Sequence, residues 1–293
     1  ESEVDFDACC KETIETIHRA KGDKNIPFCV FKVTGLASLN LLEKVTAKQT
    51  LTKEETEEYE RVKQRVNKIC KEAHDNNKPI FIDAEESWIQ QAIDDLANEN
   101  MARYNKNSAI VYNTFQLYRN DRLTYLKQSF ESGKINGYYV GAKLVRGAYM
   151  EKERERAKEK NYPSPVHDSK EACDIDYNLA LEFCVEHIDR MGLCAGTHNE
   201  KSSLVLVDLM KKKNIATNDK RIYFSQLLGM SDHISYNLAK SNYNVAKYVP
   251  YGPVKEVLPY LIRRAQENTS VKGQTGRELS LIIKEKERRK NAK

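Results

Sequence analysis

The sequence predicts an α/β protein built on a (βα)8 barrel, with one strand irregular or missed. Short apolar, β-rich runs alternate with longer helical segments along the 293 residues, and parallel strands need such crossover connections. Seven β units are visible, and the length is typical of one barrel. No Pro/Gly-rich linker and no internal repeat divides the chain, so a single domain over 1–293 is expected.

The expected strands follow one another at regular intervals. They lie at 28–35, 79–85, 109–116, 139–147, 192–199, 221–229 and 244–252. Helical segments separate them, for example at 88–105, 176–191 and 201–214. The segment at about 45–77 is longer and highly charged, and Thr52 with Glu55 fits a capping box at the start of a long helix. We interpret it as an elaborated first helix of the barrel.

The last helical pattern, within 248–268, has two faces. An apolar stripe at helical spacing runs from Val254 to Ile262, as expected of a face turned to the core. A second face gathers Tyr260, Arg263, Arg264 and Glu267. A solvated surface with an i,i+4 pair is the simplest explanation of that face.

Composition excludes several functions. The formal charge of +5 is the small difference between 48 basic and 43 acidic residues, so it predicts no nucleic-acid binding. The basic end, 284–293, is interpreted as a solvated helix terminus, with a membrane-surface role as the weaker alternative. Seven cysteines without a CxxC motif indicate reduced thiols, and the absence of HExxH or a Cys/His cluster predicts no metal site. No apolar run approaches the roughly 18 residues that span a bilayer.

Polar residues stand where the expected strands end, which is where barrel enzymes carry their active sites. They are Lys32, Asp83, Gln116, the run from Lys143 to Tyr149, Thr197-His198-Asn199, and Tyr248. Singly, each has a structural explanation, such as a Lys32–Asp83 ion pair inside the barrel. Together they are hard to explain by stability, because buried charges are costly unless they are paired or bind a ligand.

The types of these residues indicate an anionic ligand. Cations dominate, and adjacent arginines such as Arg263 and Arg264 can bind a carboxylate through several charge-assisted hydrogen bonds. Tyrosines and Leu227 offer apolar walls for a small ring. Neither GxGxxG nor GxxxxGK[ST] is present, so no Rossmann or P-loop nucleotide site is indicated. The residues alone thus predict a barrel enzyme with an anionic substrate or cofactor. They do not predict which reaction it catalyses.

Five motifs, in order, closely resemble those of the proline dehydrogenase (proline oxidase) family of the eukaryotic mitochondrial type. They are FIDAEES, KLVRGAY, AGTHN, QLLGM and KYVPYGPVKEVLPYLIRRAQEN, and the similarity runs from Lys32 to about Asn268. The resemblance implies a distorted (βα)8 barrel that binds FAD without a Rossmann motif. It implies oxidation of L-proline to Δ1-pyrroline-5-carboxylate by hydride transfer to flavin N5, in proline catabolism, with electrons passed to a membrane quinone.

The resemblance also assigns roles to residues. Arg263 and Arg264 would bind the substrate carboxylate with Lys32, Asp83 would pair with Lys32, and a ring-enclosing set would surround the substrate. That set is Tyr149, Leu227, Tyr248 and Tyr260. The flavin would be held by Gln116, Lys143, Val145, Arg146, Gly147, Ala148, Thr197, His198, Asn199 and Glu267. No residue is singled out as a general base, and proton loss to water is an equal alternative.

Three further expectations complete the resemblance. Related hydroxyproline dehydrogenases carry serine where Tyr248 stands, so proline is favoured over hydroxyproline as substrate. Bacterial bifunctional relatives have arginine in place of Lys143 and lysine in place of Arg146, which keeps the charge and alters the geometry. The eukaryotic character implies a mitochondrial protein, peripheral on the matrix side of the inner membrane. The alternatives are a hydroxyproline dehydrogenase and, from another class, a non-enzymatic basic binding module.

Overall fold

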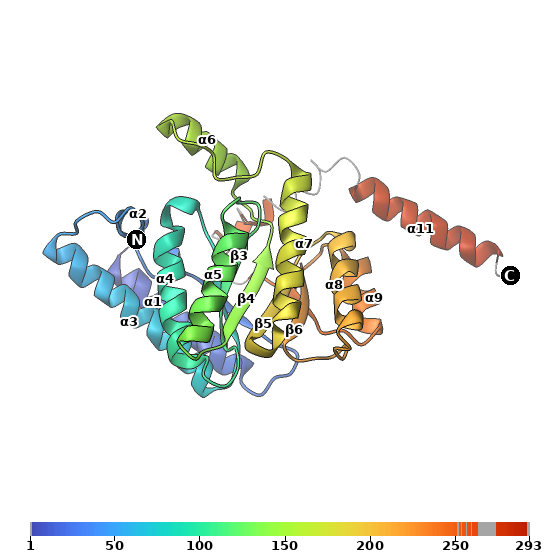
Figure 1. Ribbon diagram of the computed structural model, residues 1–293, viewed down its shortest axis with the longest axis horizontal. Helices are drawn as coiled ribbons and strands as arrows, with labels where there is room; N and C mark the ends of the chain where they lie inside the picture. The colour runs from blue at the N-terminus through green and yellow to red at the C-terminus, as the bar shows by residue number, and fades with distance from the viewer. Residues whose placement is uncertain are drawn as a thin grey trace. The chain divides into compact units, whose positions relative to one another are not determined.

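Seven short parallel strands form one sheet, whose order follows the sequence from β1 to β7 (Figure 1). The strands are β1 (Cys29–Lys32), β2 (Ile80–Asp83), β3 (Val111–Gln116), β4 (Val140–Val145), β5 (Met191–Gly196), β6 (Ile222–Leu227) and β7 (Val245–Tyr248). Each lies within, or one residue from, the segment expected for it. The parallel sheet curls as a half-barrel with helices outside, which confirms the predicted TIM-like α/β class.

The structure is a computed structural model that describes residues 2–250, 252, 254–255, 257–258, 260–262 and 274–291. Contacts divide the chain into two compact units, Glu1–Lys247 and Tyr248–Lys293. Within the described ranges the sheet has seven strands, and no eighth strand closes it. The expectation of a single domain stays a prediction.

Helices cover the outside of the sheet because each connection between parallel strands crosses it (Figure 1). α4 (Ser87–Tyr104) packs on β3, and α5 (Arg122–Ile135) packs on β3 and β4. α7 (Lys170–Glu186) packs on β4 and β5 and against α8 (Glu200–Lys212), and α9 (Asp232–Lys240) contacts β6. Short 3-10 turns, η1 (Val33–Gly35) and η2 (Ile188–Arg190), adjoin β1 and β5.

Three further helices pack on β1 or on α4. α3 (Lys53–Asp75) begins at the predicted capping box, in which the Thr52 hydroxyl and the Glu55 carboxylate each accept a backbone N–H. α1 (Glu3–Ala20), which the sequence analysis did not anticipate, packs on α3 through a buried stripe that includes Phe6, Ile14 and Ile17. α2 (Leu39–Thr46) packs on α4.

Aromatic rings fill the interior of the sheet near the amino ends of the strands. The ring of Phe28 stacks on Phe81 with centroids 4.2 Å apart and meets Tyr112 and Tyr223 edge-on. Gly192 leaves room for this cluster, because a Cβ there would lie 2.3 Å from the Tyr112 hydroxyl. Because these rings occupy the interior beside the amino ends of the strands, the polar side chains of the candidate site lie at the carboxyl ends.

Two helices remain. α6 (Met150–Lys160) follows the carboxyl end of β4, and α11 (Gln274–Asn291) belongs to the second unit. Glu285 on α11 pairs with Arg288 and Arg289, as expected for a solvated helix end. None of the seven cysteines forms a disulfide in this structure.

Candidate active site

The carboxyl ends of β1, β2 and β4 bring Lys32, Glu85 and Tyr149 together. The Lys32 Nζ donates to the Tyr149 Oη over 2.8 Å and lies 3.9 Å from a Glu85 carboxylate oxygen. Burial by itself would lower the pKa of Lys32, but the attraction of Tyr149 and Glu85 outweighs it and raises the pKa. Lys32 is therefore a permanent cation, and its ammonium has N–H donors beyond the one given to Tyr149.

Glu85 was not among the predicted site residues, although it lies in the same FIDAEES motif as Asp83. Its side chain is 3% exposed and accepts from the Thr34 N–H at 3.0 Å and the Thr34 hydroxyl at 2.7 Å. Burial raises the pKa of Glu85, and Lys32 opposes that rise. The signal that could have revealed it is its spacing of two from Asp83, since residues i and i+2 share a face of a strand.

Asp83 pairs with Lys143, not with Lys32 as expected. The Lys143 Nζ lies 2.5 Å from Asp83 Oδ1, and both side chains are close to fully buried. Ile82 registers with Asn113 and Thr114 with Lys143, so Asp83, Thr114 and Lys143 share one row across three strands. The long lysine side chain spans Thr114, while Lys32 extends past Asp83 towards Glu85.

The aromatic ring of Phe81 strengthens the Asp83–Lys143 ion pair. The Lys143 Nζ lies 5.1 Å from the centroid of the Phe81 ring, at the top of the aromatic cluster. A cation over an aromatic face is stabilised by the ring quadrupole, and a low local dielectric strengthens its attraction to Asp83. The predicted cofactor residue Lys143 and the predicted substrate residue Asp83 therefore form one charged unit.

Arg146 is held by four partners at the ends of β4 and β5. Its Nε donates to Asp174 at 2.7 Å, Nη1 to the Thr197 hydroxyl at 2.6 Å and Nη2 to the Ser202 hydroxyl at 2.9 Å. The guanidinium also lies 4.3 Å from the centroid of the Tyr177 ring. This fan of directed donors needs a planar guanidinium, which a lysine does not provide.

Asp174 on α7 is a second residue that sequence reasoning missed. Lys170 Nζ donates to it at 2.6 Å, and the Asn199 amide donates to it at 3.4–3.5 Å. Burial would raise the pKa of Asp174, but hydrogen bonds from Lys170 and Arg146 lower it overall. Only the fold brings it to Arg146, because 28 residues separate the two in the chain.

The Thr197-His198-Asn199 run turns from β5 into α8. The Thr197 hydroxyl accepts from the Asn199 N–H at 3.0 Å, and the Asn199 side chain caps α8 by accepting from the Ser202 N–H. His198 Nδ1 lies 3.0 Å from the Ser231 hydroxyl at the start of α9. The three residues are thus fixed at the strand end, next to Arg146.

The remaining predicted cofactor residues of the first unit lie at the ends of β3 and β4. The Gln116 amide, which is buried, donates to the Glu85 carbonyl at 2.6 Å. The Val145 carbonyl accepts from the Leu117 N–H at 2.8 Å. Gly147 has φ +133°, and a Cβ there would lie 1.9 Å from the Tyr118 ring, so only glycine fits; Ala148 beside it is exposed.

Six predicted site residues remain. Three of them lie on β6 or in the second unit, and the other three lie outside the described residues. Leu227 ends β6 and is partly exposed. In the second unit, the rings of Tyr248 and Tyr260 stack with centroids 6.2 Å apart. Arg263, Arg264 and Glu267 lie outside the described residues, so their roles stay predictions.

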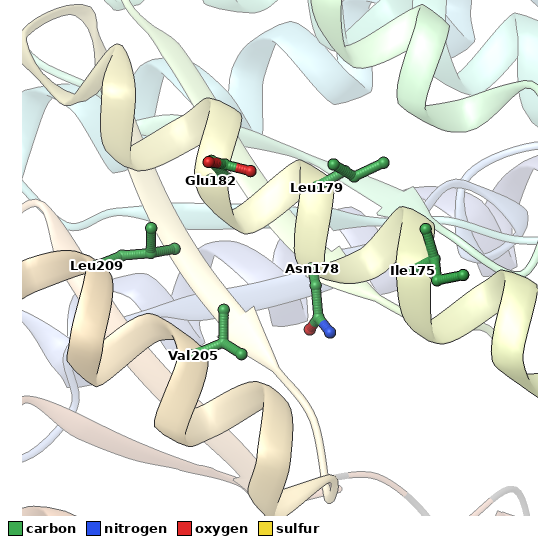
Figure 2. Close-up of a pocket in the computed structure, with 6 residues that line it drawn as sticks. All are labelled: Ile175, Asn178, Leu179, Glu182, Val205 and Leu209. Carbon is green, nitrogen blue, oxygen red and sulfur yellow. The ribbon is translucent and has the colours of Figure 1, made fainter.

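A separate pocket of about 320 Å³ lies between α7 and α8 (Figure 2). Figure 2 shows apolar side chains from both helices around it. None of its lining residues is a predicted site residue; they are Ile175, Asn178, Leu179, Glu182, Val205 and Leu209. The candidate site therefore rests on the strand ends and not on this pocket.

The described residues fit an anionic cofactor with a small anionic substrate. Lys143 and Arg146 supply two cations on one strand, and Thr197 and Asn199 add a hydroxyl and an amide beside a helix N-terminus, which favours negative groups. Lys32 lies on the side of β1, with donors to spare. The predicted cofactor residues of this group thus lie at the ends of β4 and β5 and the predicted substrate residues Lys32 and Asp83 at the ends of β1 and β2, and the Asp83–Lys143 ion pair joins the two sets.

Comparisons with known proteins show the family of the chain. A proline dehydrogenase family model matches residues 1–277. Proline dehydrogenase 1, mitochondrial, of Drosophila melanogaster is 41% identical over 245 residues, which cover 80% of this chain and 36% of the relative. The human proline dehydrogenase 1, mitochondrial, is 38% identical, over 79% of this chain and 39% of its own length.

A hydroxyproline dehydrogenase of Xenopus laevis is also similar, at 37% identity over 77% of this chain and 49% of its length. Among solved structures, proline utilization A of Bdellovibrio bacteriovorus superposes with a TM-score of 0.81 at 21% identity, over 92% of this chain and 29% of that one. The structural match supports the fold. The matches span about two fifths of the length of the Drosophila and human relatives, and by its sequence the chain belongs to the proline dehydrogenase family.

Proposed function

We propose that the protein oxidises L-proline to Δ1-pyrroline-5-carboxylate with bound FAD and passes the electrons to a quinone. The observation that carries this proposal is the Lys32–Tyr149–Glu85 cluster beside the Asp83–Lys143 pair. It offers one permanent cation with donors to spare for a carboxylate, next to a second set of cations for a cofactor. Membership of the proline dehydrogenase family supports the choice of substrate.

In this proposal Lys32 binds the substrate carboxylate. Its ammonium stays charged because Tyr149 and Glu85 raise its pKa. Binding the carboxylate at a fixed cation orients a C–H bond of Cδ, the ring carbon that becomes the C=N carbon of Δ1-pyrroline-5-carboxylate, and this lowers the barrier by proximity. Arg263 and Arg264 are proposed, from sequence alone, to assist it.

The cofactor region consists of the residues that hold Arg146 and Lys143. Bound FAD would supply the acceptor for the hydride that leaves the proline carbon next to nitrogen. Lys143 would stabilise negative charge there, because it is a cation placed against an aromatic ring in an apolar environment. Arg146, Thr197 and Asn199 would hold the anionic parts of the cofactor, with Gln116, Val145, Gly147, Ala148, His198 and Glu267 as the further proposed contacts.

A hydroxyproline dehydrogenase is the second candidate, favoured by the similar Xenopus laevis protein of that name. Tyr248 argues against it, since a bulky side chain at this position would crowd a 4-hydroxyl group. We also propose a mitochondrial location with peripheral attachment to the inner membrane, in line with the mitochondrial relatives. Within the part of the chain that the structure describes, no helix has the length and apolar character to cross a membrane.

Turnover with an artificial dye acceptor tests the proposal. Purified protein supplied with FAD is expected to reduce the dye with L-proline, to form pyrroline-5-carboxylate, and to be slower with hydroxyproline. A faster reaction with hydroxyproline would favour the second candidate. Protein that binds no FAD and reduces no dye would support the non-enzymatic binding module instead.

A further inference from the structure

One buried carboxylate outside the predicted site, Glu153 on α6, connects the ends of three strands. It has no exposed surface. Its Oε1 accepts from the Ser87 N–H at 2.6 Å and from the Tyr118 hydroxyl at 3.4 Å, and its Oε2 accepts from the Ser87 hydroxyl at 2.5 Å. No described lysine or arginine forms an ion pair with it. A buried polar group is costly unless it is hydrogen-bonded, and these three bonds satisfy both carboxylate oxygens.

The first connection leads to β2. Ser87 is the first residue of α4, directly after the Asp83–Glu86 stretch, and the N-cap residue Glu86 makes no side-chain capping bond. Glu153 takes that role from another helix, since it accepts an N–H that α4 leaves without an internal partner. A negative charge at a helix N-terminus is also stabilised by the helix dipole. Lys152 strengthens the junction through its 3.0 Å ion pair with Glu86.

The second connection leads to β3 and back to β4. Tyr118 follows β3, and its ring lies against Gly147, where a Cβ would come within 1.9 Å. Its N–H donates to the Arg146 carbonyl at 2.7 Å. Tyr118 therefore fixes the backbone of Arg146 and Gly147, while its hydroxyl reaches Glu153. α6 begins directly after Tyr149. Glu153 is therefore linked to both ends of the 146–149 loop, through Tyr118 at Arg146 and through its own helix at Tyr149.

We propose that Glu153 is a positioning residue of the active site. By binding Ser87 and Tyr118 it sets the loop 146–149 against the end of β2, and so places Arg146 and Tyr149 relative to Glu85. This inference rests on the proposed function and deepens it. Glu153 is not expected to touch substrate or cofactor.

The test compares Glu153→Ala with a matched control at the other end of the sheet. Asn105 is also fully buried and polar, and it ties the amino ends of β3 and β4 through Val111 and Tyr139. Asn105→Ala should cost similar stability but leave the strand carboxyl ends in place. Both variants are compared by melting temperature, FAD dissociation constant, KM and kcat for proline, and hydrogen exchange of residues 84–87 and 146–149.

Glu153→Ala is expected to raise the FAD dissociation constant and the KM for proline by about tenfold, because a displacement of about 1 Å can cost far more than the contact itself. Hydrogen exchange at 84–87 and 146–149 should rise, while Asn105→Ala should change neither the exchange there nor the two constants beyond about twofold. Glu153→Gln, which keeps an acceptor for Ser87, should restore most of the loss.

Three results would overturn the inference. One is equal weakening of FAD and proline binding by Glu153→Ala and Asn105→Ala at equal loss of melting temperature. Another is unchanged exchange at 146–149 in Glu153→Ala. If that variant does not fold, Tyr118→Phe, which keeps the ring and removes the hydroxyl, must show the same pattern more weakly, and no change in exchange would refute the inference. Because hydrogen exchange needs no cofactor, a wild-type protein that binds no FAD refutes the proposed function and leaves this test intact.

Discussion

Replacement of Lys32 by methionine tests the substrate side of the site. An ammonium has three N–H groups, of which one donates to Tyr149 at 2.8 Å. Glu85 lies 3.9 Å away, too far to accept a hydrogen bond, so two donors are left for a carboxylate. The side chain of Lys32 is 42% exposed, so water screens part of the interaction.

The expected change in the KM for proline follows from these contacts of Lys32. A hydrogen bond to a charged group contributes about 1.5–3 kcal/mol, and the partial exposure of Lys32 favours the lower half of that range. At about 1.4 kcal/mol for each factor of ten, Lys32→Met should raise the KM for proline by about 10- to 30-fold. Methionine keeps the length and apolar stem, so the change in kcat should be smaller.

Steady-state kinetics with a dye acceptor measure this effect, with pyrrolidine as the comparison substrate. Pyrrolidine lacks the carboxylate, so its kcat/KM should not change in Lys32→Met. Lys44→Met is the matched control, because Lys44 also pairs with a glutamate, at 2.5 Å, and is 32% exposed. The reasoning is refuted if KM for proline is unchanged, or if pyrrolidine loses as much kcat/KM as proline.

Two further predictions concern substrate choice and stability. Tyr248→Ser should slow proline turnover and raise the ratio of hydroxyproline to proline kcat/KM by about tenfold, roughly the effect of relieving one steric clash; an unchanged ratio contradicts it. Asp174 has a pKa below its usual value, so the stability it contributes is present above its unfolded pKa and is lost as the pH falls through its folded pKa. Asp174→Asn should therefore lower the melting temperature at pH 7 and approach the wild type as the pH falls through the folded pKa of Asp174, whereas a constant difference would show that the charge of Asp174 does not stabilise the fold.

The strands could be predicted because their sequence signal is local. Parallel strands covered on both faces are read as short continuous apolar runs, as in Ile80-Phe81-Ile82 of β2, all of which are buried. The capping box at Thr52 is equally local and was also found. α6 is harder, because nine of its eleven residues are charged, and its one fully buried carboxylate, Glu153, is indistinguishable in sequence from its solvated neighbours.

The partners of the site residues could not be predicted in the same way. Asp83 and Lys143 lie 60 residues apart, and the choice of Lys143 over Lys32 depends on the register across β3. Arg146 and Asp174 meet because α7 packs on β4 and β5. Motifs therefore predicted which strand ends carry the site, while the pairing of charges within the candidate site needed the fold.

The protein's absorption spectrum, recorded without oxygen, tests the central claim most directly. Purified protein supplied with FAD and freed of excess cofactor should be yellow, and L-proline should bleach the flavin band, whereas D-proline should not. A protein that stays colourless after FAD is supplied, or a yellow protein whose spectrum L-proline leaves unchanged, would contradict the assignment of the strand-end site to proline oxidation.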